Sequence, residues 1–201
     1  MKIAKNILLI VIVILVGGNS VYFAKLDETK ASRAQKDFDA KQYAEEFWKK
    51  LIPAAESAIS LETLITSLSS DPAMAFDKHS HALGIGNLRY FLVKGRATAE
   101  TVEADYVTVS SQVRLSTEFI FGNAVRDASG LIDINDFVNT MDFNNVSTEI
   151  NKIVREKVVP PFKSTVREGD KVEFIGAVEL NKEHLQLKNI EVIPIQLTIV
   201  K

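Results

Sequence analysis

One stretch of the chain concentrates side chains that could recognise a ligand. Residues 121–137 read FGNAVRDASGLIDINDF, in which polar side chains are interleaved with apolar ones. An arginine offers a planar, permanently charged fork for a carboxylate or phosphate. Carboxylates and amides can hydrogen-bond the hydroxyl groups of a sugar. These residue types predict a ligand-binding or partner-binding site made of Asn123, Arg126, Asp127, Asn135 and Asp136.

The same residues also have a structural interpretation. Arg126 lies among apolar neighbours, and a partly buried arginine needs a carboxylate because an unpaired buried charge is costly. The nearest carboxylates in the sequence are Asp127, Asp133 and Asp136. We therefore expect Arg126 to be partly buried and bonded to one of them. In this interpretation Asn123 and other asparagines of the stretch satisfy turns.

A calcium site is a third interpretation of this stretch. The sequence ASGLIDIND resembles an EF-hand loop, with Gly130 at the sharp turn and Asp136 where the last acidic ligand belongs. Val125 then falls at the first position, where a carboxylate is needed. His79 and His81 lie one residue apart without an evident third ligand nearby. We therefore predict no metal site and no cofactor, and keep a calcium-binding structural module as an alternative.

The sequence contains no recognisable catalytic motif. It lacks G-x-S-x-G, S-x-x-K and H-E-x-x-H, and it has no cysteine to serve as a nucleophile, a thiolate ligand or a disulfide. The paired acids Asp133 and Asp136 could in principle cleave a glycosidic bond. We therefore predict a protein that is not an enzyme, with an envelope hydrolase acting on a glycoside as the alternative. The formal net charge of −2 disfavours nucleic acid as a partner.

The amino-terminal part predicts export. Residues 1–24 combine Lys2 and Lys5 with an apolar run from Ile7 to Val16 and read as a signal anchor or a signal peptide. Basic residues before the run hold that end in the cytoplasm. The polar residues 25–37 follow as a stalk, and residues 38–201 are predicted to form a single exported domain. We expect a cell-envelope protein, anchored in the inner membrane through residues 1–24, with its domain on the periplasmic side.

Hydrophobic periodicity then gives the elements that position the central stretch. Apolar residues recur at helical spacing from Ala40 to Ser57, which starts a helical layer over residues 38–76. From residue 88 the period changes to two. The predicted strands are Leu88–Ala97, Thr101–Ser110, Val113–Phe121, Lys171–Glu179 and Leu185–Val200, with a helix over Val146–Val159 capped by Asn144 or Asn145. On the third strand, Leu115 and Phe119 should be buried, and Arg114 and Glu118 more exposed.

Three strands, a helix and two strands occur in the order typical of an OB-fold. The predicted fold class is α+β. A membrane tether and a helical layer are packed on an OB-fold-like, partly open five-stranded antiparallel barrel over residues 88–200. Gly176 is expected to mark a bend or bulge in the fourth strand.

Four segments of the chain resemble one bacterial family. They are FDAKQYAEEFWKKLIPA (38–54), YFLVKGRAT (90–98), FGNAVRDASGLIDINDFVN (121–139) and GDKVEFIGAV (169–178). The family is known only as predicted periplasmic lipoproteins, a domain of unknown function whose members are often encoded beside simple-sugar ABC importers. The resemblance implies an envelope location and, from the neighbouring genes, components of a sugar ABC importer as partners, but it brings no known activity. Together with the absence of catalytic motifs, it leads us to predict a non-catalytic binding or accessory protein. This chain has no cysteine for a lipid, so a peptide anchor would take its place.

Overall fold

The computed structural model describes residues 38–83 and 86–200. The chain divides into two compact units, Met1–Phe38 and Asp39–Lys201, and the second is described here. The predicted anchor or signal peptide (1–24) and the stalk (25–37) lie outside the described residues. Within the described part, no helix is both long enough and apolar enough to cross a membrane.

Three helices form the layer that precedes the barrel. They are α3 (Ala40–Ala55), α4 (Leu61–Ser70) and α5 (Pro72–His79), with the short strand β1 (Ile59–Ser60) before α4 and β2 (Ser80–His81) after α5. Each helix begins at a side-chain cap, because Asp39, Ser60 and Asp71 accept hydrogen bonds from backbone N–H groups of the first turn. The helix predicted over Ala40–Ser57 is confirmed, and it ends at Ala55.

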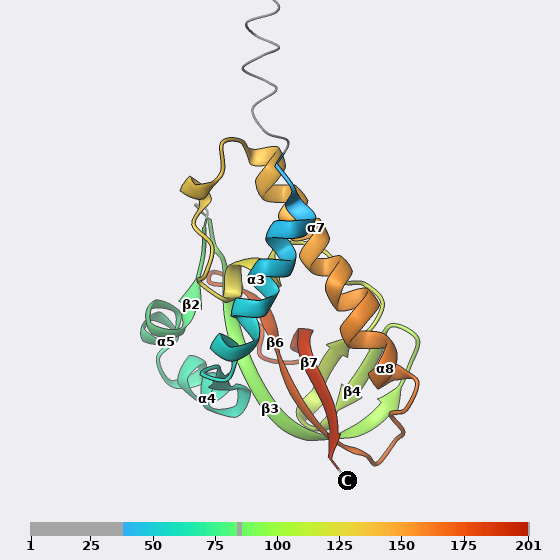
Figure 1. Cartoon of the computed structure of the whole chain (residues 1–201). Coiled ribbons are helices and arrows are strands. Elements are labelled where there is room, and N and C mark those ends of the chain that lie inside the picture. The colour runs from blue at the N-terminus through green and yellow to red at the C-terminus, as the bar shows by residue number, and fades with distance from the viewer. Residues whose placement is uncertain (1–37, 84–85, 201) are drawn as a thin grey trace, which may run out of the picture. The chain divides into compact units, whose positions relative to one another are not determined.

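Five strands form the barrel, and four of its five pairings are antiparallel. The strands are β3 (Leu88–Val102), β4 (Tyr106–Val109), β5 (Val113–Ser116), β6 (Lys171–Asn181) and β7 (Glu191–Val200). The neighbours run β3-β4-β5-β7-β6, and β6 pairs back with β3. The predicted OB-fold-like architecture is therefore confirmed. Figure 1 shows the strands curving around one core while α3 and α7 cover one side.

The barrel differs from the prediction in two linked respects. It is closed rather than partly open, and β5 pairs in parallel with β7 rather than antiparallel. The reason is topological. An odd number of strands cannot alternate in direction all the way around a closed ring, so one neighbouring pair must run in the same direction. This parallel pair is short, because β5 has only four residues, and it joins Arg114 to Glu191 and Leu115 to Val192.

Two glycines allow β3 and β6 to coil tightly. Gly95 faces Phe174 across the β3–β6 pair, and a Cβ at Gly95 would lie 2.5 Å from Cζ of the phenylalanine ring. At Gly176 a Cβ would lie 2.6 Å from the carbonyl oxygen of Ile193 and would also overlap a methyl group of Val192. The β6–β7 register shifts between Ile175 and Gly176, which confirms the bulge predicted there.

The third strand is shorter than predicted and ends at Ser116. Leu115 is buried and Arg114 and Glu118 are exposed, as expected, but Phe119 is 52% exposed and the expectation that it is buried was wrong. The backbone N–H of Thr117 donates to Asp105 and its hydroxyl donates to Ala104. Beyond these bonds the chain bends at residues 117–118, and the N–H of Ile120 donates to the carbonyl of Glu118 at 3.0 Å, so the period-two pattern beyond Ser116 no longer marks a strand.

The helical connection between β5 and β6 is longer than predicted. It includes α6 (Ala124–Ala128), the short turn η2 (Ile134–Asp136), α7 (Thr140–Ile153), a π-helical turn η3 (Val154–Val158) and α8 (Val159–Lys163). Asn139, rather than Asn144 or Asn145, caps α7 by accepting from the N–H of Asp142 at 2.8 Å. Pro160 lacks an N–H and cannot continue α-helical bonding, which accounts for the π-turn before it.

The described residues bury two apolar clusters. One fills the barrel and is also covered by α4, α5 and α8, with Phe91, Val107 and Leu115 among its members. The other lies between α3, α6, α7 and the outer side of the sheet, with Leu51 and Ile150 among its members. The central stretch 121–137 belongs to this second cluster, which decides the environment of its polar residues.

Candidate functional site

Arg126 lies at the centre of a buried polar cluster. Its side chain is 3% exposed, and its guanidinium bonds both carboxylate oxygens of Asp127, Nε–Oδ1 at 2.5 Å and Nη2–Oδ2 at 3.2 Å. Nη1 donates to the Ser147 hydroxyl at 2.8 Å and to the Phe143 carbonyl at 3.3 Å. The guanidinium also lies over the ring of Phe143, 3.5 Å from its centroid. The prediction that Arg126 is buried and bonded to a carboxylate is confirmed.

Helix α7 holds the first half of the stretch through side-chain bonds. The Ser147 hydroxyl donates to Asn123 Oδ1 at 3.1 Å, and Asn151 donates to the Gly122 carbonyl at 2.8 Å. Arg155 of the following turn η3 donates to the carbonyl of Ile120, just before the stretch. No buried side-chain nitrogen or oxygen in the described residues lacks a hydrogen-bond partner. Arg126 and Asp127 therefore face the protein interior with their bonding capacity occupied, which is the structural interpretation of these residues.

The structure brings Asn123, Arg126 and Asp127 together but leaves Asn135 and Asp136 apart from them, on an exposed turn. Asp133 caps this turn and accepts from both the backbone N–H and the side-chain amide of Asn135, at 2.8 Å each. The five residues predicted as one site therefore belong to two separate structures.

The features that resemble a calcium loop have other physical causes. Gly130 has a positive φ of 64°, and a Cβ there would lie 2.7 Å from Cε1 of His81, so the glycine is needed for the turn and for this contact. The carboxylate of Asp127 is already ion-paired with the guanidinium of Arg126 and is not available to a metal ion. Among the described residues, no three His, Asp or Glu side chains gather closely enough to hold a metal ion.

A groove along β3 is a more accessible candidate site. Its volume is about 670 Å³, within the range of about 300–1,000 Å³ typical of ligand pockets. The groove exists because β1 pairs with β3 only as far as Lys94, whereas β4 begins to pair at Ala99. Between these points the edge of β3 opposite β6 has no strand partner in the part of the chain that the structure describes.

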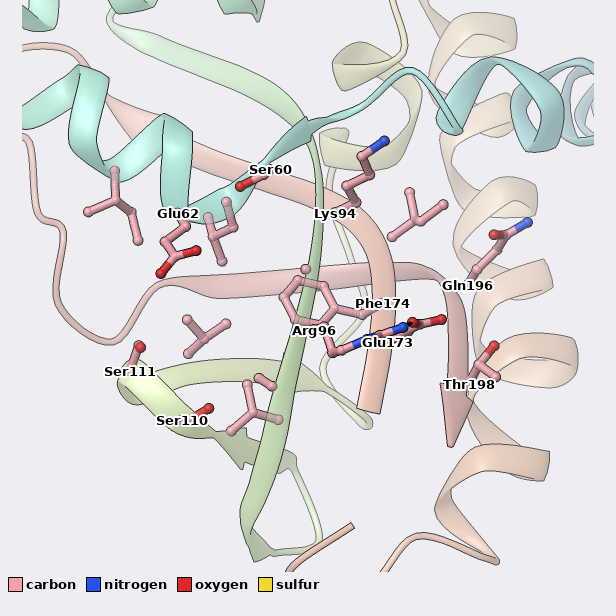
Figure 2. A pocket seen from close by; sticks show the side chains of 17 residues that line it. Ser60, Glu62, Lys94, Arg96, Ser110, Ser111, Glu173, Phe174, Gln196 and Thr198 are labelled. Carbon is pink, nitrogen blue, oxygen red and sulfur yellow. Dashed lines mark hydrogen bonds and ion pairs between the residues drawn. The ribbon is translucent and has the colours of Figure 1, made fainter. Parts of the chain in front are cut away.

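The lining of this β3 groove is polar at its rim and apolar at its floor. The polar side chains are Ser60, Glu62, Lys94, Arg96, Ser110, Ser111, Glu173, Gln196 and Thr198, and the apolar ones include Ile65, Ala97, Val109, Val113, Phe174 and Ile175. Figure 2 shows Arg96 and Glu173 together, with Ser110 and Ser111 on one side and Gln196 and Thr198 on the other. The lining holds two carboxylates, Glu62 and Glu173, and two cationic side chains, Lys94 and Arg96. It therefore carries no net formal charge.

The charged groups of the groove are positioned by neighbouring strands. Arg96 is paired in register with Glu173, and its Nε bonds the carboxylate at 2.7 Å. Glu173 is in turn opposite Thr198 on β7. Lys94 donates to the Glu56 carbonyl at 2.8 Å, and Ser110 accepts from the N–H of Thr98 at 3.1 Å. Sequence reasoning missed this site because its residues come from separate segments. The sequence offered one signal for this site, which was a glycine between two cationic residues, Lys94-Gly95-Arg96, within a predicted strand.

Tyr90 provides a test of the polar cluster at alkaline pH. Burial raises the pKa of its phenol to about 12, with further contributions from the charge of Glu179, the charge of Asp127 and a hydrogen bond with Glu179. The folded pKa lies above the ordinary value of 10.0, so the folded state keeps the proton longer than the unfolded chain does. The resulting stabilisation is complete below pH 10 and is lost as the pH rises towards about 12.

We expect urea-unfolding curves recorded across this alkaline range to show a fall in the free energy of unfolding. Tyr90→Phe should show a shallower fall, because it removes the group that titrates differently in the two states. Identical alkaline profiles for both proteins would contradict this assignment.

Comparison with known proteins places this architecture in a family. The family model described as "Predicted periplasmic lipoprotein (DUF2291)" matches residues 11–198. The chain belongs to this family. The description points to the cell envelope as the location of DUF2291 proteins, although this chain has no cysteine that could carry a lipid. It assigns no activity to the family.

A solved structure supports the same fold. An OB-fold protein from Thermotoga maritima shares 31% sequence identity with this DUF2291 chain and superposes with a TM-score of 0.76. The similarity covers 82% of this chain and all of the other. No curated protein matches the chain significantly.

Proposed function

We propose that this chain is a non-catalytic binding or accessory protein of the cell envelope, tethered through residues 1–24, whose ligand occupies the β3 groove. The ligand is a neutral, polyhydroxylated molecule, and a saccharide is the best match. Components of a sugar ABC importer are its proposed partners. The observation that carries the proposal is the lining of the groove, which combines hydroxyl, amide, guanidinium and carboxylate groups with no net charge.

The chemistry of a saccharide fits this lining. A sugar hydroxyl both donates and accepts hydrogen bonds, and the groove offers Arg96 as a donor, Glu173 as an acceptor and Gln196 as both. The three lie on the adjacent strands β3, β6 and β7, so a flat ring could contact all of them. The apolar floor suits the C–H faces of a sugar. A phosphate or nucleic acid would favour an excess of cations, which this groove lacks.

Arg96→Ala should weaken saccharide binding without unfolding the domain. Loss of hydrogen bonds from a charged donor corresponds to about 1.5–3 kcal/mol, or roughly a 10-fold to 100-fold weaker affinity. The measurement is thermal-shift screening of residues 25–201 against mono- and oligosaccharides, followed by calorimetry with the sugars that stabilise the protein. Arg114→Ala is the matched control, because Arg114 is an exposed arginine of β5 outside the groove.

Stabilisation by a sugar that is equal in both variants would contradict the groove as the binding site. No stabilisation by any sugar would contradict a saccharide as the ligand.

Glycoside hydrolysis remains the alternative, because Glu62 and Glu173 both line the groove. Two carboxyl groups on either side of a scissile bond are the usual machinery of glycosidases. Chromatography of each bound oligosaccharide after prolonged incubation separates the two functions. A binding protein returns the sugar intact, whereas an enzyme yields products that disappear in Glu62→Gln or Glu173→Gln.

A further inference from the structure

Exposed apolar side chains gather on the segment that leads into α7. Val138 is 85% exposed and Met141 is 71% exposed, and Leu131 and Ile134 are also exposed. All four lie within residues 131–141, which run through the turn η2 into the first turn of α7. Single exposed apolar residues need no explanation, but four on one short segment indicate an interaction surface. This set of four residues is called the apolar rim below.

The apolar rim lies at the end of the domain where the preceding chain enters. The ring of Phe137, next to Val138, packs on Tyr43 in the first turn of α3, with centroids 5.2 Å apart. The same ring contacts Phe143 of α7 at 5.1 Å. Figure 1 shows α3 and α7 beginning at the same end of the domain and running side by side. The first turn of α3 therefore lies beside the apolar rim.

We propose that the apolar rim docks the domain on the surface of the membrane that holds residues 1–24. The proposal rests on the tether of the proposed function and is independent of the groove ligand. Residues 25–37 number thirteen, and a fully extended chain of that length reaches at most about 45 Å, which limits how far this end of the domain can lie from the proposed anchor. Under that constraint the nearest apolar phase for Val138 and Met141 is the lipid.

Charge decides which lipid surface fits. Asp133 and Asp136 are exposed on the same segment, and the half-buried Asp142 follows it in α7. These carboxylates would be repelled by anionic headgroups. The apolar rim therefore suits a zwitterionic surface, into which aliphatic side chains insert without electrostatic attraction. Docking should weaken as the anionic lipid fraction rises.

The test is site-specific labelling of the full chain, which has no native cysteine. Met141→Cys and the control Met74→Cys each receive an environment-sensitive fluorophore, and the proteins are reconstituted into phosphatidylcholine vesicles. Met74 is 56% exposed on α5, away from the end where α7 begins. The label at position 141 should shift to shorter emission wavelength and be quenched by nitroxide lipids, whereas the label at position 74 should do neither.

Val138→Asp should abolish the shift and the quenching at position 141. Adding anionic lipid should reduce both signals. Equal, water-like emission from the two labels overturns the proposal, as does a label at position 141 that is shielded only when other envelope proteins are added. A full chain that does not remain with the vesicles also overturns it, because the tether is then absent, while sugar binding in the groove is measured separately on residues 25–201.

Discussion

Replacing Arg126 with alanine is expected to destabilise the domain by about 3–5 kcal/mol, the usual effect of removing one partner from a buried ion pair. The substitution leaves the buried carboxylate of Asp127 without its guanidinium and removes the donor that ties α6 to Ser147 of α7. It also removes the stacking on Phe143. Urea unfolding at neutral pH measures this change.

The matched control is Arg96→Ala. Arg96 also pairs with a carboxylate, that of Glu173, but its side chain is 66% exposed. Exposed ion pairs contribute about 0–1 kcal/mol, so the two arginine variants should differ severalfold in their effect on stability. For sugar affinity we expect the opposite order. Arg96→Ala should weaken it, whereas Arg126→Ala should leave it unchanged under conditions in which the variant is folded. An Arg126→Ala domain that is fully stable but fails to bind would make Arg126 a binding residue instead.

Gly176→Ala is expected to destabilise the barrel by about 1–3 kcal/mol or more, because it overpacks a well-filled core. The added methyl group would meet the carbonyl oxygen of Ile193 and a methyl group of Val192 on β7. The backbone oxygen cannot move away without breaking the β6–β7 pairing around the bulge. Thermal and urea unfolding measure the effect.

Gly95→Ala provides a graded comparison. The atoms nearest to its added methyl group would be outer ring atoms of Phe174, and a side chain can turn more easily than a strand can shift. We therefore expect a smaller loss of stability than for Gly176→Ala. The reverse order would show that the bulge at Gly176 is more adaptable than its contacts indicate.

The polar cluster could be predicted from the sequence in part. An arginine among apolar residues needs a carboxylate, and this rule alone identified the pairing of Arg126, with Asp127 among the candidates. The rule did not distinguish the buried members of the stretch from Asn135 and Asp136, because a turn at Gly130 separates them in space rather than in sequence. Resemblance and element order identified the family and the barrel.

The groove and the barrel closure required the structure. The groove depends on where β1 and β4 stop pairing with β3, and strand pairing between distant segments leaves no periodic signal in a single sequence. Phe119 continued the alternation of β5 although the chain already bends at residues 117–118. The parallel β5–β7 pair follows from closing a ring of five strands, which element order alone did not specify.

The position of β7 has a consequence for the order of folding. This strand is the last in the chain, and it fills the space between β5 and β6, the first of which lies far earlier in the sequence. Until it is available, β5 and β6 each expose an unpaired edge, and the barrel cannot close. Such long-range closure makes folding slow compared with local helix formation. Closure of the barrel therefore waits for β7, which pairs with both β5 and β6.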